Sequence, residues 1–137
     1  MIVSALLLGC VIALAFSNGA NDVSKGIATL VGSRVTRVKT AVAWGTLWTV
    51  AGALTAAFAA QGLVRAFSGS GLISPLPEGH AFLLAVCLGA LGWISFATRT
   101  GLPVSTTHAI TGALVGAGLV AVRAEGIQWS ALAEKFL

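Results

Sequence analysis

The amino-acid sequence predicts an all-α integral membrane protein, on three observations about its composition and pattern. Of its 137 residues, 57% are hydrophobic and only 9% are charged, and the mean hydropathy is +0.96. Soluble domains carry roughly a quarter charged residues, so this chain could not cover a soluble surface with charge. The hydrophobic residues also fall into four long runs. Most of these runs approach the roughly 20 apolar residues that a transmembrane helix needs.

The net charge of +4 does not indicate a nucleic-acid-binding protein. A protein that binds the phosphate backbone needs a clustered basic face, whereas the basic residues here are scattered between apolar runs. The densest basic group, Arg34, Arg37 and Lys39, lies in a short connection, and the positive-inside rule places that connection in the cytoplasm. Cys10 and Cys87 lie within apolar runs without the spacing of metal ligands, so we expect no cofactor.

The first apolar run is interrupted by polar residues. It comprises a short helix at 2–16, a polar break at 17–22 and a half-helix at 23–32. This pattern predicts a broken or re-entrant helix. If the element crosses the bilayer, the positive-inside rule places the amino terminus outside; if it is a re-entrant hairpin, the amino terminus is inside.

The rest of the sequence predicts three further helices, and residues 1–137 form one membrane domain. In one predicted helix Gly45 and Gly52 lie two turns apart, and in another Gly112 and Gly116 have the spacing that favours close helix packing. The segments are, in order, helix 40–63, a solvated loop at 64–80, helix 81–98, motif 103–108, helix 105–122 and a tail at 123–137 that is either an interfacial helix or the start of a further segment.

The first polar motif is Gly19-Ala20-Asn21-Asp22. Asp22 is the only acidic residue in the first 77 residues, and a charged side chain inside a membrane segment costs about 2.5–3.5 kcal/mol on insertion scales. The carboxylate therefore needs a partner, which could be a cation such as Na⁺, the nearby Lys25, or water. The alternative is that Asn21 and Asp22 only cap a helix that starts at Val23.

The second polar motif is Pro103-Val104-Ser105-Thr106-Thr107-His108. Pro103 disfavours helix before it and suits the first turn of a helix after it. The hydroxyl groups of Ser105, Thr106 and Thr107 then lie at a helix start, which also offers free backbone N–H groups and a positive dipole end. Together these groups make a cradle for an anion, although the hydroxyls could also serve only as helix caps.

The two motifs together indicate a cation-coupled anion transporter. Broken helices at membrane depth are tolerated only where they line a cavity or pack against protein. In transporters such helix starts face anions, while carboxylates and unwound carbonyls hold cations. A bound Na⁺ or H⁺ would offset the repulsion between Asp22 and an anion. The residues alone leave the anion unidentified.

At these residues the sequence resembles the inorganic phosphate transporter (PiT) family, whose signatures are matched by residues 19–23 and 103–108. The resemblance implies symport of phosphate with Na⁺ or H⁺ by a multi-pass protein of the cell membrane, with a fold of two inverted repeats that each carry both motifs. It implies that Asn21 and Asp22 hold the coupling cation, with Asp22 the ligand of Na⁺ in a sodium-coupled member. The phosphate-binding residues implied are Asn21, Ser105, Thr106 and Thr107, with supporting roles for Lys25 and His108.

This chain carries one copy of each motif, so the resemblance implies a second repeat. That repeat would be an inverted copy of this chain, a separate half-chain, or the rest of a longer protein. Lys25 stands where many family members have a second Asn, and its pairing with Asp22 or with the anion would alter coupling. The alternatives are a sulfate transporter of the same family and a membrane subunit that does not transport. An enzyme is excluded because the sequence has no plausible catalytic triad, phosphate-binding loop or metal-ligand cluster.

Overall fold

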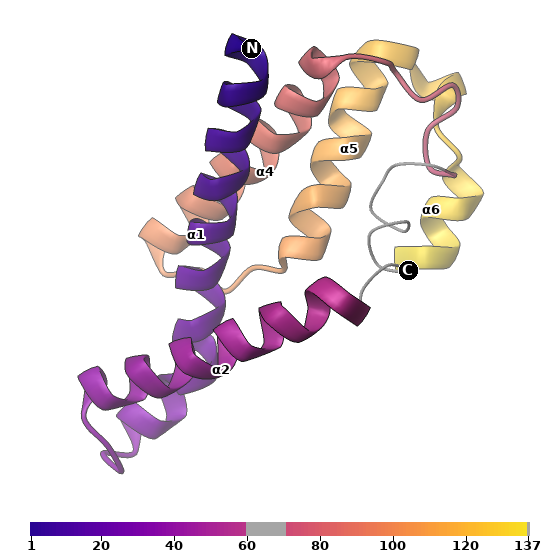
Figure 1. The fold of residues 1–137 in the computed structure, drawn as a ribbon. Helices are drawn as coiled ribbons and strands as arrows, with labels where there is room; N and C mark the ends of the chain where they lie inside the picture. Colours follow the sequence, from indigo (N-terminus) through magenta and orange to yellow (C-terminus); the bar gives the residue numbers. More distant parts are fainter. Residues whose placement is uncertain (60–70, 137) are drawn as a thin grey trace.

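The computed structural model describes residues 1–59 and 71–136, and this part of the chain consists of helices and connections, with no β-strand (Figure 1). Within the described ranges, three helices are long and apolar enough to cross a membrane, and a further apolar helix, α5, has 17 residues. The predicted all-α membrane class is therefore confirmed. The helices are α1 (Ile2–Gly32), α2 (Val38–Ala59), α4 (His80–Thr100), α5 (Thr106–Val122) and α6 (Trp129–Phe136), with a 3₁₀ turn at Ala124–Gly126.

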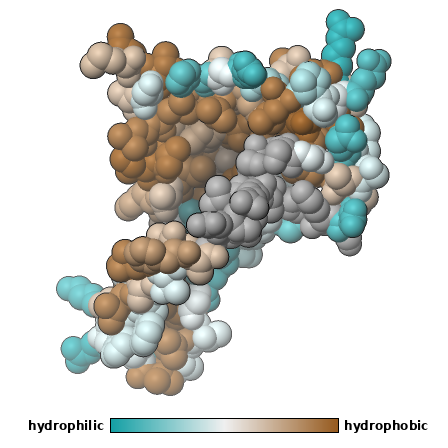
Figure 2. All heavy atoms as spheres, turned by 45° about the vertical axis from the view of Figure 1, so that its right-hand side comes forward, coloured by the Kyte–Doolittle hydropathy of each residue, from teal (hydrophilic) through white to brown (hydrophobic). Residues whose placement is uncertain are grey.

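Helix α4 is the centre of the bundle, packed between α1 and α5 (Figure 1). It buries five residues, whereas α2 buries only Ala41. Helices α1 and α4 run parallel, because residues later in α1 contact residues later in α4. Ser17 meets Ser95, and Asn21 meets Thr98. Large apolar side chains remain exposed on α1, α2 and α4, which gives the molecule the hydrophobic surface of a membrane protein (Figure 2).

Helix α1 is continuous from Ile2 to Gly32, so the predicted polar break at 17–22 and the half-helix at 23–32 are wrong. This element is neither a broken helix nor a re-entrant hairpin. The segment contains no proline, and Ser, Asn and Gly each cost a helix at most about 1 kcal/mol. A break inside the membrane would instead leave backbone groups unpaired, at several kcal/mol each. The polar side chains keep the helix intact and find partners on its neighbours.

The other helices differ from the sequence boundaries by one or two residues at the ends that the structure describes, which is the usual uncertainty of helix ends. Helix α2 begins at Val38 rather than residue 40. Helix α4 spans His80–Thr100 rather than 81–98, and α5 begins at Thr106 with Ser105 as its N-cap. The predicted end of the second helix and residues 64–70 of the loop lie outside the described residues. The tail forms the 3₁₀ turn and α6.

The segment before α4 is not fully solvated, which corrects the prediction for this part of the loop. Leu72 and Ile73 are 1% and 3% exposed and pack with Phe82 of α4 and Leu114 of α5. Ile73 also forms an antiparallel bridge with Ile127, which directly follows the 3₁₀ turn. The apolar side chains explain the difference, because burying them stabilises the fold by an amount that grows with the area removed from water or headgroups.

Close helix packing uses only some of the expected glycines. A Cβ added to Gly45 would lie 2.9 Å from Val23 Cγ1, so α2 approaches α1 closely at this point. Gly52, Gly112 and Gly116 have nothing within 4 Å of the equivalent position. Within the described residues, the predicted Gly-x-x-x-Gly face of α5 is therefore not a packing face.

Candidate functional site

A non-helical connection at residues 101–105 joins α4 to α5 and carries half of the candidate site. Gly101 ends α4 in the left-handed conformation, with φ 73°, and the Leu102 N–H donates to the Ala97 carbonyl at 2.8 Å. This is a Schellman motif, in which glycine avoids the steric cost of a Cβ. Pro103 then stops further helix, and the Ser105 side chain caps α5 by accepting from the His108 N–H at 3.4 Å.

Asn21 is the buried polar residue that ties α1 to this connection. Its side chain is 6% exposed, and Nδ2 donates to Thr98 Oγ1 and to the Leu102 carbonyl, each at 3.3 Å. Because a carbonyl oxygen can only accept, the contact with Leu102 fixes the orientation of the amide. Oδ1 is buried and has no hydrogen-bond partner among the described residues. An unpaired buried acceptor costs about 1–3 kcal/mol, so this oxygen is available to a ligand.

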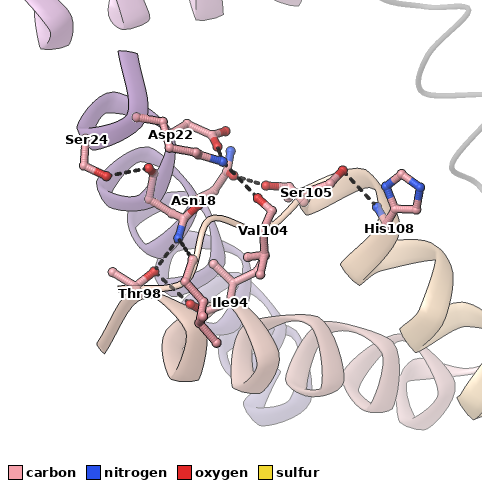
Figure 3. Close-up of polar contacts among 12 residues, drawn as sticks. Asn18, Asp22, Ser24, Ile94, Thr98, Val104, Ser105 and His108 are labelled. Atoms are coloured by element: carbon pink, nitrogen blue, oxygen red, sulfur yellow. Dashed lines mark hydrogen bonds and ion pairs between the residues drawn. The ribbon is translucent and has the colours of Figure 1, made fainter. Parts of the chain in front are cut away.

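A second contact between the motifs involves Asn18, which the sequence reasoning missed. Thr106 Oγ1 donates to Asn18 Oδ1 (Figure 3). Asn18 lies three residues before Asn21, so the two amides share one face of α1. That spacing was a signal that could have identified Asn18, but the residue was assigned to a polar break instead of a helix face.

Lys25 joins the two motifs at a third point. Its Nζ lies 2.6 Å from Asp22 Oδ1 and donates to the Val104 carbonyl at 2.9 Å. The side chains of Lys25 and Asp22 are 38% and 48% exposed. Of the three partners that the sequence allowed for Asp22, the structure therefore has Lys25 in place. Asp22 and Val104 belong to different motifs, and the ammonium group bridges them (Figure 3).

Two hollows adjoin these residues. A small cavity of about 80 Å³ lies between α1 and the connection, and its lining includes Asn21, Lys25 and Thr98. An open groove of about 660 Å³ runs beside the start of α5, and its lining includes Ser105 and His108. The small cavity has the size for a water molecule or a single ion. The groove has room for a tetrahedral oxyanion.

The structure brings most of the predicted site residues together, with different exposures. Ser105, Thr107 and His108 are exposed, Thr106 is half-buried and Asn21 is buried. The residues that the structure describes contain no group of three or more His, Cys, Asp or Glu side chains that could hold a metal ion.

Parallel membrane helices that carry a buried Asn with a free acceptor, an ion pair and a helix start with hydroxyl residues define an integral membrane protein with a polar site between its helices. Comparison with known protein families identifies the family to which it belongs. The chain belongs to the phosphate transporter family, whose model matches residues 18–137. It is a multi-pass protein of the cell membrane, and the family is one of transporters, in agreement with the exclusion of an enzyme.

The chain is similar to curated proteins over most of its own length. It is 35% identical over 89% of its length to a Streptomyces halstedii protein named "Probable low-affinity inorganic phosphate transporter", of which it covers 55%. It is 34% identical over 85% of its length to a "Sodium-dependent phosphate transporter" of Plasmodium falciparum, of which it covers 18%. It is also 33% identical to a phosphate-repressible phosphate permease of Neurospora crassa, over 84% of this chain and 20% of that protein.

The chain thus spans about half, or less, of the length of these relatives. Their names refer to phosphate, which gives the sulfate alternative no support. No solved structure matches the chain.

Proposed function

We propose that this chain forms part of a transporter that moves inorganic phosphate across the cell membrane together with Na⁺ or H⁺. The observation that carries the proposal is the meeting of the two motifs. Asn18, Asn21 and Lys25 of α1 all make polar contacts with residues 98–106, about 80 positions away in the sequence. The name of the Plasmodium relative supports a sodium-coupled mechanism.

Phosphate binds at the start of α5 in this proposal. Ser105 and Thr107 are exposed residues there, beside the free N–H groups and the positive dipole end of a 17-residue helix. Thr106 holds the helix start against Asn18, and His108 supports the turn through its backbone contact with Ser105. The hydroxyl groups can donate hydrogen bonds to phosphate oxygens.

The coupling cation binds between α1 and the connection. Asp22 provides a carboxylate, and Asn21 provides the unpaired Oδ1, which are oxygen ligands of the kind that hard cations prefer. The two Nδ2 donor positions of Asn21 are already engaged. Asn21 therefore contributes to phosphate binding through Oδ1, as an acceptor from a protonated phosphate, or through the cation.

A second repeat completes the site. The groove beside Ser105 and His108 is open, and the described residues that line it belong to α4, α5 and their connection. In an inverted-repeat transporter the corresponding helices of the other half close such a site at the bilayer midplane. The second repeat is a separate half-chain, an inverted copy, or the rest of a longer protein.

The test is uptake of radiolabelled phosphate into liposomes that contain the purified chain, with Na⁺ and H⁺ gradients imposed in turn. Asp22→Asn should abolish the cation dependence, because it removes the carboxylate charge, while insertion stays unchanged. Glu78→Gln is the matched control, since Glu78 is an exposed acidic residue outside α1 and should leave coupling unaltered. Coupling that survives in Asp22→Asn would refute the role of Asp22.

If the chain alone gives no uptake, the measurement is repeated with a second half-chain taken from a full-length relative. Uptake restored by that half supports the two-repeat arrangement. No uptake with either arrangement, in protein that is correctly inserted, would favour the non-transporting subunit. An excess of sulfate should not compete with phosphate.

A further inference from the structure

The ammonium group of Lys25 lies where a cation bound to Asp22 would lie. We propose that Lys25 is an internal competitor of the coupling cation. It occupies the cation's oxygen ligands when the cation is absent, and the cation displaces it on binding. The inference rests on the proposed function, because it concerns the coupling cation of that transporter.

The ligands of the Lys25 ammonium group support this assignment. Nζ lies 2.6 Å from a carboxylate oxygen of Asp22 and 2.9 Å from the backbone carbonyl oxygen of Val104. A carboxylate and a carbonyl from non-helical backbone are the oxygen types that hold cations in transporters. An ammonium group and a monovalent metal ion compete for such oxygens, since both carry one positive charge.

A bound ion would gain a ligand that Lys25 leaves unused. Asn21 and Lys25 line the same 80 Å³ cavity, and Asn21 Oδ1 is buried without a partner in the described part of the chain. Nζ makes its contacts with Asp22 and Val104 instead. Asp22 does not line this cavity, so the Asn21 oxygen becomes a ligand only for an ion that lies at the cavity side of the Lys25 ammonium position, and such a ligand favours the exchange.

The exchange keeps the charge beside Asp22 balanced throughout. A carboxylate left without a partner at membrane depth is costly, whereas here one positive charge replaces another. The displaced side chain also releases the Val104 carbonyl, which directly precedes Ser105. Cation binding at α1 would therefore change a contact of the segment that presents hydroxyl groups to phosphate.

The test compares Lys25→Met with the wild-type chain in binding rather than in transport. The half-saturating Na⁺ concentration is measured from ²²Na⁺ binding and from the rise in melting temperature with NaCl, at ionic strength held constant with choline chloride. If the Lys25 ammonium group occupies the cation's ligands about three-quarters of the time, the apparent affinity for Na⁺ is weakened about fourfold. Lys25→Met should lower the half-saturating concentration by roughly that factor, and Lys25→Arg should keep it near the wild-type value, because the charge remains.

Lys39→Met is the control, since it removes a basic residue at the start of α2, away from the candidate site. It should leave the half-saturating concentration unchanged. The melting temperatures of the same variants are also measured in Na⁺-free buffer as the proton concentration is varied. This second measurement tests a protein that is coupled to H⁺.

The outcomes separate the two proposals. Equal cation affinities in Lys25→Met and wild type would overturn the competitor role while leaving cation coupling intact. Weaker phosphate binding in Lys25→Met at unchanged cation affinity would also overturn it and would assign Lys25 to the anion. No response to Na⁺ or H⁺ in any variant would overturn the coupled function itself.

Discussion

Thr106 and Thr107 are adjacent in the sequence, but their hydroxyl groups have different surroundings. Thr106 is half-buried and donates to Asn18 on α1, whereas Thr107 is exposed. One residue of the motif thus joins two helices, and the next is free to meet a ligand. The sequence alone treats the two hydroxyls as equivalent.

We expect Thr106→Val to destabilise the chain by about 0.5–1.5 kcal/mol, because it removes an interhelical hydrogen bond with little change in volume. Thr107→Val should leave stability within about 0.5 kcal/mol and weaken phosphate binding. Thermal unfolding in detergent and equilibrium binding of radiolabelled phosphate measure the two effects. Equal stability losses in both variants would contradict the division of roles.

Residues that could be identified from the sequence are those whose chemistry is unusual in a membrane. Asp22 is one, because a lone carboxylate in an apolar segment needs a partner. The contact between Lys25 and the Val104 carbonyl could not be predicted, since it joins positions 79 residues apart. The spacing of residues in the sequence shows which of them share a helix face, but it does not show which segment packs against that face.

At the scale of the elements, the positions of the helices followed from hydropathy, but the continuity of α1 did not. A run of Ser, Asn, Gly and Asp is locally a turn signal. In the folded chain, Ser17, Asn18 and the Nδ2 group of Asn21 form hydrogen bonds with other segments, and the helix stays unbroken. Tertiary hydrogen bonds therefore outweighed local propensity. In the second motif, Pro103 disfavours helix before it, so that break was predictable from the sequence.

The end of α4 gives a test at this scale. Gly101→Ala should destabilise the chain by about 1–2 kcal/mol, because Gly101 has φ 73° and an L-residue is strained there. Gly92→Ala is the matched control within the same helix, where nothing lies within 4 Å of the added methyl group. It should be neutral or stabilise by up to about 1 kcal/mol. The melting temperature should fall in Gly101→Ala and should stay unchanged or rise in Gly92→Ala, and an equal fall in both variants would contradict the assignment of Gly101.

On the scale of the whole molecule, the parallel packing of α1 and α4 places their starts on one side of the membrane. The segment before α4 therefore lies on the amino-terminal side, and the basic connection after α1 lies on the other. With Arg34, Arg37 and Lys39 in the cytoplasm, we expect the amino terminus to face outside.

Cysteine labelling tests this orientation. A membrane-impermeant maleimide should label Glu78→Cys in intact cells, and Ser33→Cys only after permeabilisation. The native Cys10 and Cys87 are buried and provide the unlabelled background. The reverse pattern would contradict the topology. Partial labelling of both variants in intact cells would show two opposite orientations, as required if the second repeat is an inverted copy of this chain.

The unbroken course of α1 has a mechanical consequence. A transporter must open its site first to one side of the membrane and then to the other. At 1.5 Å per residue, the 31 residues of α1 form a rod about 46 Å long, which has no joint beside Asn21. A continuous helix of this kind moves as a rigid body, by tilting or sliding. For the proposed transport function, we therefore expect any bending to occur in the non-helical connection that contacts α1, the five residues from Gly101 to Ser105.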